Sequence, residues 1–216
     1  MLNNLNVIDD MKFLENEYYI CIEAVRENIE DKIKLYNELE NYLDYNTILA
    51  TNTSSIKIND LSKGLKYKKR FLGVHFFNPA DKMPLIELSK TSVTDIEKYD
   101  EIKKFLESLG KNVIEVKDSS GFIVNRILIK SINEAALLVE ENVCNLQEID
   151  KALKTGAGWP MGPFELADFI GIDVCLNILE NFQNYFDGLR ISNILYEKVN
   201  NNELGRKTKK GFYEYR

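Results

Sequence analysis

The first half of the chain alternates short, almost continuous apolar runs with stretches whose apolar residues recur every three or four positions. Continuous apolar runs of this kind are typical of strands buried on both faces of a sheet. The runs cover residues 18–22, 47–50, 71–74, 85–88 and 113–116. The clearest helical stripe between them consists of Ile29, Ile33, Tyr36, Leu39 and Leu43. Strands that alternate with helices predict an α/β domain with a mainly parallel sheet.

The pattern changes at residues 117–121, where a polar stretch ends in glycine. Beyond this stretch no run resembles a strand. Helical patterns instead cover residues 125–141, 145–156, 164–169 and 172–185. We therefore expect an α/β domain over residues 1–118 and an all-α domain over residues 119–216. Capping-box patterns predict the starts of two helices, at Thr94 with Glu97 and at Asn145 with Glu148.

Charge and cysteine usage exclude several classes of protein. The net charge of −6 argues against a general nucleic-acid binder, whose surface is basic. No apolar run approaches the roughly 20 residues that span a bilayer, and the N-terminus lacks a signal-peptide pattern. Cys21, Cys144 and Cys175 lie far apart among apolar residues. They predict reduced thiols of a cytoplasmic protein rather than metal ligands or a disulfide framework.

The single histidine of the chain, His75, directly follows one of the apolar runs. Catalytic side chains of open α/β sheets usually lie where strands run out into loops, and imidazole titrates near neutral pH. The alternative is a polar side chain packed at a strand end. Glu87 lies inside the next apolar run, where an unpaired carboxylate is costly to bury, so we expect it to have a partner. Its alternative is a solvated carboxylate at a sheet edge.

Four further polar residues have structural interpretations of their own. Ser54 lies in Asn-Thr-Ser-Ser after a strand, a pattern that favours a turn or a helix cap. Glu27 and Lys32 are, taken alone, exposed helix charges, because such side chains are rarely buried. Asn125 interrupts an apolar helix face, where a purely structural role does not explain it.

Six motifs occur in order along the chain. They are Glu-Ala-Val-Arg-Glu-Asn (23–28), Ala-Thr-Asn-Thr-Ser-Ser (50–55), Gly-Val-His-Phe-Phe-Asn-Pro (73–79), Gly-Phe-Ile-Val-Asn-Arg (121–126), Pro-Met-Gly-Pro-Phe-Glu-Leu-Ala-Asp (160–168) and Gly-Arg-Lys-Thr (205–208). With them the chain resembles the 3-hydroxyacyl-CoA dehydrogenase family, in particular its short bacterial members that act on 3-hydroxybutyryl-CoA. The resemblance runs from about residue 23 to the C-terminus.

The resemblance implies an oxidoreductase that interconverts (S)-3-hydroxyacyl-CoA and 3-ketoacyl-CoA by hydride transfer with NAD or NADP, in fatty-acid or butanoate metabolism. It implies that His75 is the catalytic base and that Glu87 accepts a hydrogen bond from the other ring nitrogen. In the same way, Ser54 contacts the reacting oxygen and Asn125 positions the acyl group.

Three residues match cofactor contacts of the family, namely Asn52 beside the nicotinamide together with Glu27 and Lys32. The family also dimerises through its helical domain, so the resemblance implies a homodimer. The basic run over residues 63–70 could attract CoA phosphates, but a solvated loop is the favoured interpretation.

One family feature is missing from the sequence. Family members carry a Gly-x-Gly-x-x-Gly turn whose amides hold the cofactor pyrophosphate, and no such pattern occurs here. The resemblance therefore predicts a truncated Rossmann-type sheet without the Gly-rich βαβ unit. It also predicts weakened NAD(H) binding and an unpaired apolar strand edge at residues 18–22.

Three hypotheses stay open at this level. The chain is the catalytic part of a dehydrogenase completed by a separately encoded N-terminal fragment, or a non-catalytic remnant that acts as an acyl-CoA-binding or oligomerising module. A carnitine-type relative shares the histidine and glutamate pattern. The motifs of the helical domain favour the hydroxyacyl-CoA enzymes over the third hypothesis.

Overall fold

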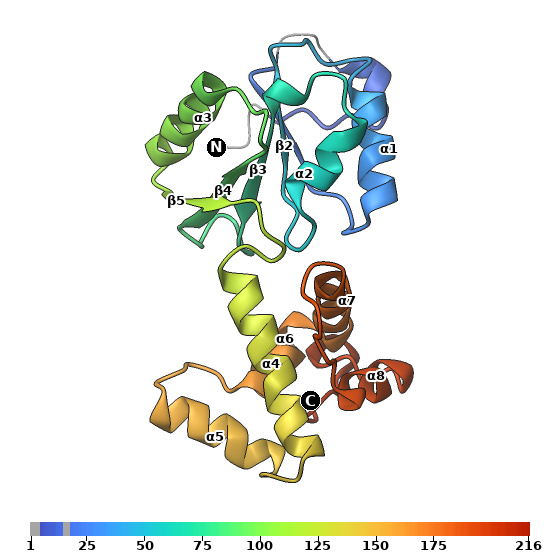
Figure 1. The fold of residues 1–216 in the computed structure, drawn as a ribbon, viewed down its shortest axis with the longest axis vertical. Coiled ribbons are helices and arrows are strands. Elements are labelled where there is room, and N and C mark those ends of the chain that lie inside the picture. The colour runs from blue at the N-terminus through green and yellow to red at the C-terminus, as the bar shows by residue number, and fades with distance from the viewer. Residues whose placement is uncertain (1–4, 15–17) are drawn as a thin grey trace. The chain divides into compact units, whose positions relative to one another are not determined.

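The computed structural model describes residues 5–14 and 18–216. The chain forms two compact units, Met1–Phe122 and Ile123–Arg216, which are considered separately below. Figure 1 shows the sheet and its helices in the first unit and helices alone in the second. The prediction of a mainly parallel sheet followed by a helical domain is confirmed.

The first unit is built on a five-stranded sheet in the order β1-β2-β3-β4-β5. The strands are β1 (Ile20–Glu23), β2 (Ile48–Thr51), β3 (Phe71–Phe76), β4 (Leu85–Lys90) and β5 (Asn112–Lys117). All neighbouring strands are parallel except β3 and β4, which run antiparallel. The carboxyl ends of β1, β2 and β3 consequently meet at one edge of the sheet.

Helices cover both faces of this sheet. They are α1 (Ile29–Leu39), α2 (Ile58–Leu61) and α3 (Ile96–Ser108), with 3-10 turns at Met11–Phe13, Ser62–Gly64 and Lys68–Arg70. Figure 1 shows α3 on one face and α1 and α2 on the other. Strand residues alternate between the two cores: Leu49 packs with α1 and α2, whereas Ile48 and Ala50 pack with α3.

The start of α3 differs from the prediction. Its N-cap is Asp95, whose side chain accepts a hydrogen bond from the Glu97 amide, so the predicted cap at Thr94 is wrong. The Thr94 hydroxyl instead donates to the Phe71 carbonyl at 2.7 Å and joins the neighbouring Thr91 hydroxyl. Because the Thr94 hydroxyl is bonded to a carbonyl of β3, the next residue, Asp95, caps the helix.

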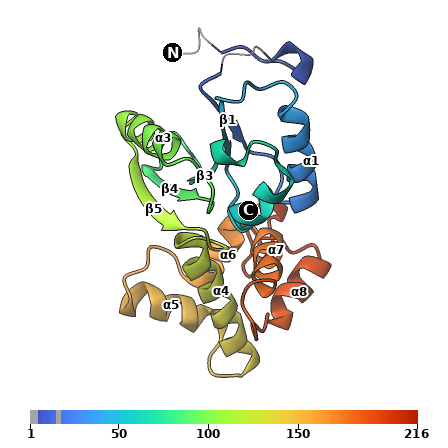
Figure 2. The ribbon, with the colours of Figure 1, turned by 45° about the horizontal axis from the view of Figure 1, so that its top comes forward.

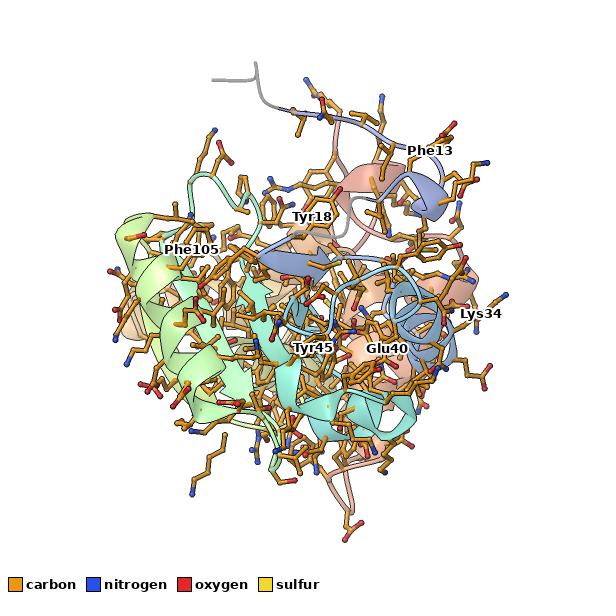
Figure 3. All side chains as sticks on the ribbon, turned by 90° about the horizontal axis from the view of Figure 1, so that it is seen from above. Phe13, Tyr18, Lys34, Glu40, Tyr45 and Phe105 are labelled. Carbon is orange, nitrogen blue, oxygen red and sulfur yellow. The ribbon has the colours of Figure 1, made fainter. Side chains whose placement is uncertain are left out.

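Strand β1 lies at one side of the sheet and β5 at the other (Figure 2). Among the described residues β1 pairs with β2 alone, which leaves the backbone of its second edge without a strand, as predicted. Tyr19 and Ile22 are partly exposed beside this edge. In Figure 3 Tyr18 is labelled where the chain enters β1, and Phe105 projects from α3, where its ring meets that of Tyr19.

The second unit is helical. Its helices are α4 (Val124–Glu140), α5 (Leu146–Gly156), α6 (Pro163–Ile170), α7 (Ile172–Gln183) and α8 (Asn193–Asn200), followed by a 3-10 turn at Arg206–Thr208. They enclose an apolar core that includes Ile132, Phe164 and Leu179. The predicted cap of α5 is confirmed, because the Asn145 side chain accepts a hydrogen bond from the Glu148 amide. Helix α8 was not predicted.

Candidate active site

His75 and Glu87 form a buried hydrogen-bonded pair. The antiparallel register sets the two residues directly opposite each other on β3 and β4. His75 Nδ1 lies 2.8 Å from Glu87 Oε2, and both side chains are almost fully buried. The expected hydrogen bond is therefore present, and the alternative of a solvated edge carboxylate is wrong. A carboxylate at Nδ1 favours the tautomer whose Nε2 can accept a proton.

Asn52 ties the end of β2 to the end of β3. Its Oδ1 accepts a hydrogen bond of 2.8 Å from the Phe76 amide. Because β2 and β3 are parallel, their carboxyl ends lie side by side, and the residues after β2 follow the same sheet edge as His75. Ligands of open α/β sheets bind at this edge.

Glu27 holds the turn that contains Ser54. Its Oε1 lies 2.7 Å from the Thr53 hydroxyl, 2.9 Å from the Ser54 amide and 2.7 Å from the Ser55 amide. Burial opposes the ionisation of this carboxyl, but the hydrogen bond from Thr53 and the charge of Lys32 outweigh it. The pKa of Glu27 is held below its usual range. The carboxylate thus positions the Ser54 turn from a distant part of the chain.

Lys32 is buried rather than exposed. Only 1% of its side chain is accessible, and its ammonium lies 2.6 Å from Glu23 Oε1 and 3.4 Å from Glu27 Oε2. The interpretation of Lys32 as an exposed helix charge is therefore wrong. The same interpretation fails for Glu27, which precedes α1 and is largely buried. A buried ammonium needs such partners, because an unpaired charge is costly away from water.

The sequence did not single out Glu23, the partner of Lys32. Its second carboxylate oxygen accepts hydrogen bonds from the Tyr36 hydroxyl at 2.5 Å and the Thr51 hydroxyl at 2.8 Å. Burial, together with the negative charge of Glu23, raises the pKa of Tyr36. Glu23 directly follows the apolar run over residues 18–22 and is the last residue of β1, so burying its carboxylate without a partner would be costly, as it would be for Glu87.

Asn125 is the second residue of α4 and belongs to the second unit. Its side chain is half-buried there. The contribution of Asn125 to the site around His75 stays a prediction.

The arrangement in the first unit suits proton transfer to and from a hydroxyl group. The His75 imidazole is oriented by a buried carboxylate, and a turn with a serine hydroxyl follows a neighbouring strand at the same sheet edge. No helix in the described part of the chain combines the length and apolar character that a membrane crossing requires.

Two protein families match the chain in sequence. Residues 1–119 match the family described as "3-hydroxyacyl-CoA dehydrogenase, NAD binding domain". Residues 121–215 match "3-hydroxyacyl-CoA dehydrogenase, C-terminal domain".

Similar curated proteins carry related names. A 3-hydroxybutyryl-CoA dehydrogenase of Bradyrhizobium diazoefficiens is 44% identical over 202 residues, which are 91% of this chain and 68% of that protein. A probable 3-hydroxyacyl-CoA dehydrogenase of Caenorhabditis elegans is 42% identical over 200 residues, which are 91% of this chain and 67% of that protein.

Solved structures share the fold. The (S)-3-hydroxybutyryl-CoA dehydrogenase PaaH1 from Ralstonia eutropha gives a TM-score of 0.87 at 39% identity, over 92% of this chain and 71% of that one. M. tuberculosis FadB2 gives a TM-score of 0.91 at 35% identity, over 96% of this chain and 74% of that one.

Proposed function

The chain belongs to the 3-hydroxyacyl-CoA dehydrogenase family, and on this premise we propose that it interconverts (S)-3-hydroxybutyryl-CoA and acetoacetyl-CoA with NAD or NADP. The names of the similar proteins favour this substrate. The observation that carries the proposal is the buried hydrogen bond between His75 and Glu87. The comparisons do not favour a non-catalytic module or a carnitine-type enzyme.

The proton chemistry follows from the geometry of the pair. With Nδ1 engaged by Glu87, His75 takes the 3-hydroxyl proton on Nε2 during oxidation and returns it during reduction. The buried carboxylate stabilises the imidazolium that forms in between. Ser54 hydrogen-bonds the reacting oxygen, and Asn125 positions the acyl group. A bound nicotinamide supplies the acceptor for the hydride.

The residues after β2 fit the nicotinamide end of the cofactor. Asn52 uses its oxygen for Phe76, so its amide NH2 group is the part offered to the nicotinamide. Glu27 and Lys32 support the cofactor contacts by holding the Ser54 turn.

The pyrophosphate end requires an element that the printed sequence does not contain, since it has no Gly-x-Gly-x-x-Gly pattern. We propose that a Gly-rich strand-turn-helix unit pairs with the open edge of β1, and a separately encoded fragment is one source of such a unit. NAD(H) binding is weak without it, because backbone amides of a Gly-rich turn hold the pyrophosphate.

We also propose a homodimer formed through the second unit and a cytoplasmic location. Helices α4 and α6 each expose a large apolar side chain, Ile127 and Phe169, both 57% accessible. These two side chains are where we expect the subunits to meet, because the family resemblance implies dimerisation through the helical domain. All three cysteines are free thiols, which is usual in the cytoplasm.

The test is NADH oxidation with acetoacetyl-CoA by the purified chain, alone and mixed with a Gly-rich fragment taken from a family member. We expect activity that the fragment increases and that His75→Gln abolishes, with no activity towards carnitine. A fluorescence titration with NADH measures cofactor binding separately. Lack of activity in the mixture despite measurable NADH binding would refute the catalytic proposal.

A further inference from the structure

A basic cavity of about 530 Å³ lies at the amino-terminal ends of the strands, within the first unit. Four lysines line it, namely Lys66, Lys68, Lys69 and Lys98. Arg70, which also lines it, directly precedes β3, whereas His75 lies near the other end of that strand. At 3.3 Å per residue the two are about 16 Å apart along the strand. The cavity is therefore separate from the candidate active site.

Arg70 carries two buried donors without acceptors. Its side chain is 2% accessible, and its Nη1 donates to the carbonyl groups of Asp44 and Thr47. Among the described residues, Nε and Nη2 have no hydrogen-bond partner. Glu40 Oε1 is 3.9 Å from Nη2, which balances charge without forming a hydrogen bond. An unsatisfied donor on a charged side chain is costly to bury, so an acceptor entering the cavity has unmet donors to satisfy.

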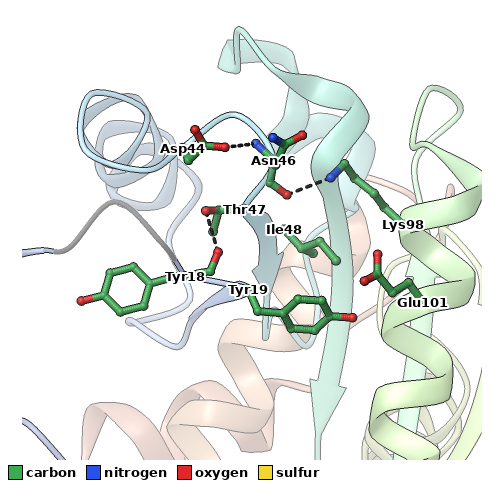
Figure 4. Close-up of a pocket in the computed structure, with 8 residues that line it drawn as sticks. All are labelled: Tyr18, Tyr19, Asp44, Asn46, Thr47, Ile48, Lys98 and Glu101. Atoms are coloured by element: carbon green, nitrogen blue, oxygen red, sulfur yellow. Dashed lines mark hydrogen bonds between the residues drawn. The ribbon is translucent and has the colours of Figure 1, made fainter.

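The carboxylates near the cavity are already engaged. The buried Glu40 carboxylate accepts hydrogen bonds from the Lys66 and Tyr67 amides, both at 2.9 Å. Asp95 accepts from the Glu97 amide at 2.9 Å. Asp44 accepts from the Asn46 amide at 2.7 Å, as Figure 4 shows for the neighbouring cavity of about 620 Å³.

The ammonium groups of these lysines are available to an anionic ligand. Lys66, Lys68 and Lys69 form no ion pair within the part of the chain that the structure describes. The ammonium of Lys98 donates to the Asn46 carbonyl at 2.8 Å, which fixes its place between the two cavities (Figure 4). In a chain of net charge −6, this concentration of positive charge favours an anionic ligand.

Two exposed tyrosines complete the cavity wall. Tyr45 is 64% accessible and Tyr67 is 50% accessible, and the Tyr67 ring lies 5.3 Å from the Arg70 guanidinium carbon. Large exposed aromatic rings beside basic residues are the usual surface on which nucleic-acid bases stack. A solvated lysine loop, the interpretation favoured by the sequence, accounts for the lysines but not for Arg70 or the tyrosines.

We propose that this cavity binds a phosphorylated nucleotide, with its phosphates against the lysines and its base on Tyr45 or Tyr67. A volume of this size lies within the range of small-molecule sites. The cavity is separate from the site of the proposed dehydrogenase reaction, because it lies at the opposite edge of the sheet from His75.

Isothermal titration of the full chain with ADP, and in parallel with inorganic pyrophosphate, tests the proposal. The double variant Lys68→Gln and Lys69→Gln should weaken ADP binding about tenfold or more, since it removes two charge-assisted contacts to the phosphates. The matched control is Lys34→Gln with Lys104→Gln, which removes the same charge from exposed positions on α1 and α3. Figure 3 shows Lys34 projecting from α1.

A second pair of measurements tests stacking. Tyr45→Ala combined with Tyr67→Ala should weaken ADP binding but leave pyrophosphate binding unchanged. Absence of ADP binding, equal weakening by both lysine pairs, or unchanged ADP binding in the tyrosine double variant would each overturn the proposal. None of these results depends on catalysis, so the proposed dehydrogenase function stands or falls separately.

Discussion

Replacing Glu27 with alanine should release the turn that contains Ser54. In the native protein Glu27 Oε1 accepts the amides of Ser54 at 2.9 Å and Ser55 at 2.7 Å, as well as the Thr53 hydroxyl. A hydrogen bond to a charged group contributes about 1.5–3 kcal/mol. In the variant, two backbone amides lose their carboxylate acceptor. Water replaces part of the lost hydrogen bonding, because 18% of the Glu27 side chain is accessible. We expect the variant to be destabilised by about 3 kcal/mol in the first unit.

Hydrogen exchange measures this loss where it occurs. About 3 kcal/mol corresponds to a factor of roughly 100 in an equilibrium constant, so the Ser54 and Ser55 amides should exchange about 100-fold faster in Glu27→Ala. Glu27→Gln is the matched control, because its amide oxygen still accepts both hydrogen bonds but carries no charge. The Ser54 and Ser55 amides should exchange at most about tenfold faster in Glu27→Gln than in the native protein. Amides of the second unit should not change in either variant.

The effect of Glu27 depends on pH in a defined direction. Its folded pKa is lowered from an ordinary value of 4.5, because the hydrogen bond from Thr53 and the charge of Lys32 outweigh burial. A lowered pKa gives stability that is fully present above pH 4.5 and is lost as the pH falls through the folded pKa. The difference between the native protein and Glu27→Gln should therefore be constant near neutral pH and shrink in acid. Unchanged amide exchange in Glu27→Ala, or a difference that grows in acid, would refute the reasoning.

Three further outcomes are expected. Glu87→Gln should lower kcat of acetoacetyl-CoA reduction by about 10²-fold or more with little change in KM, because the imidazolium loses its charged partner; an unchanged kcat would contradict an orienting role. Burial, with the charge of Asp173, raises the pKa of the Cys175 thiol to about 12, so mass spectrometry should find it unalkylated at pH 8 until the protein unfolds. If the proposed homodimer forms through the second unit, Ile127→Glu should shift it towards monomer in light scattering, and an unshifted dimer would place the interface elsewhere.

The strands were predictable because burial on both faces of the sheet requires a continuous run of apolar residues. Each apolar run in the sequence overlaps a strand of the structure, and no end differs by more than two residues. The start of α3 was ambiguous because Thr94 and Asp95 are adjacent and both can cap a helix. Only the tertiary contact of Thr94 with the Phe71 carbonyl decides between them. Helix α8 is short and its ends are asparagines, so its apolar stripe carries little signal.

The hydrogen-bonded pair of the candidate site was predictable, whereas its supporting network was not. His75 follows an apolar run and Glu87 lies within one, which drew attention to both residues, and the family resemblance implied that they pair. Lys32 is buried by a contact with Glu23 on another element, and general burial preferences argue against such a position. Polar networks of this kind depend on which side chains the fold brings together, and helical periodicity does not predict these contacts.

The antiparallel pairing of β3 and β4 makes the pair of His75 and Glu87 tolerant of insertions in the connection between the strands and intolerant of register shifts within them. Residues 77–84 connect the two strands outside the ladder, so insertions there can be absorbed while the register persists. A shift of one residue within the ladder would turn Glu87 to the opposite face, because successive side chains alternate. Homologues that change the length of this connection should therefore keep the pair, and a single-residue deletion inside β4 should destroy it.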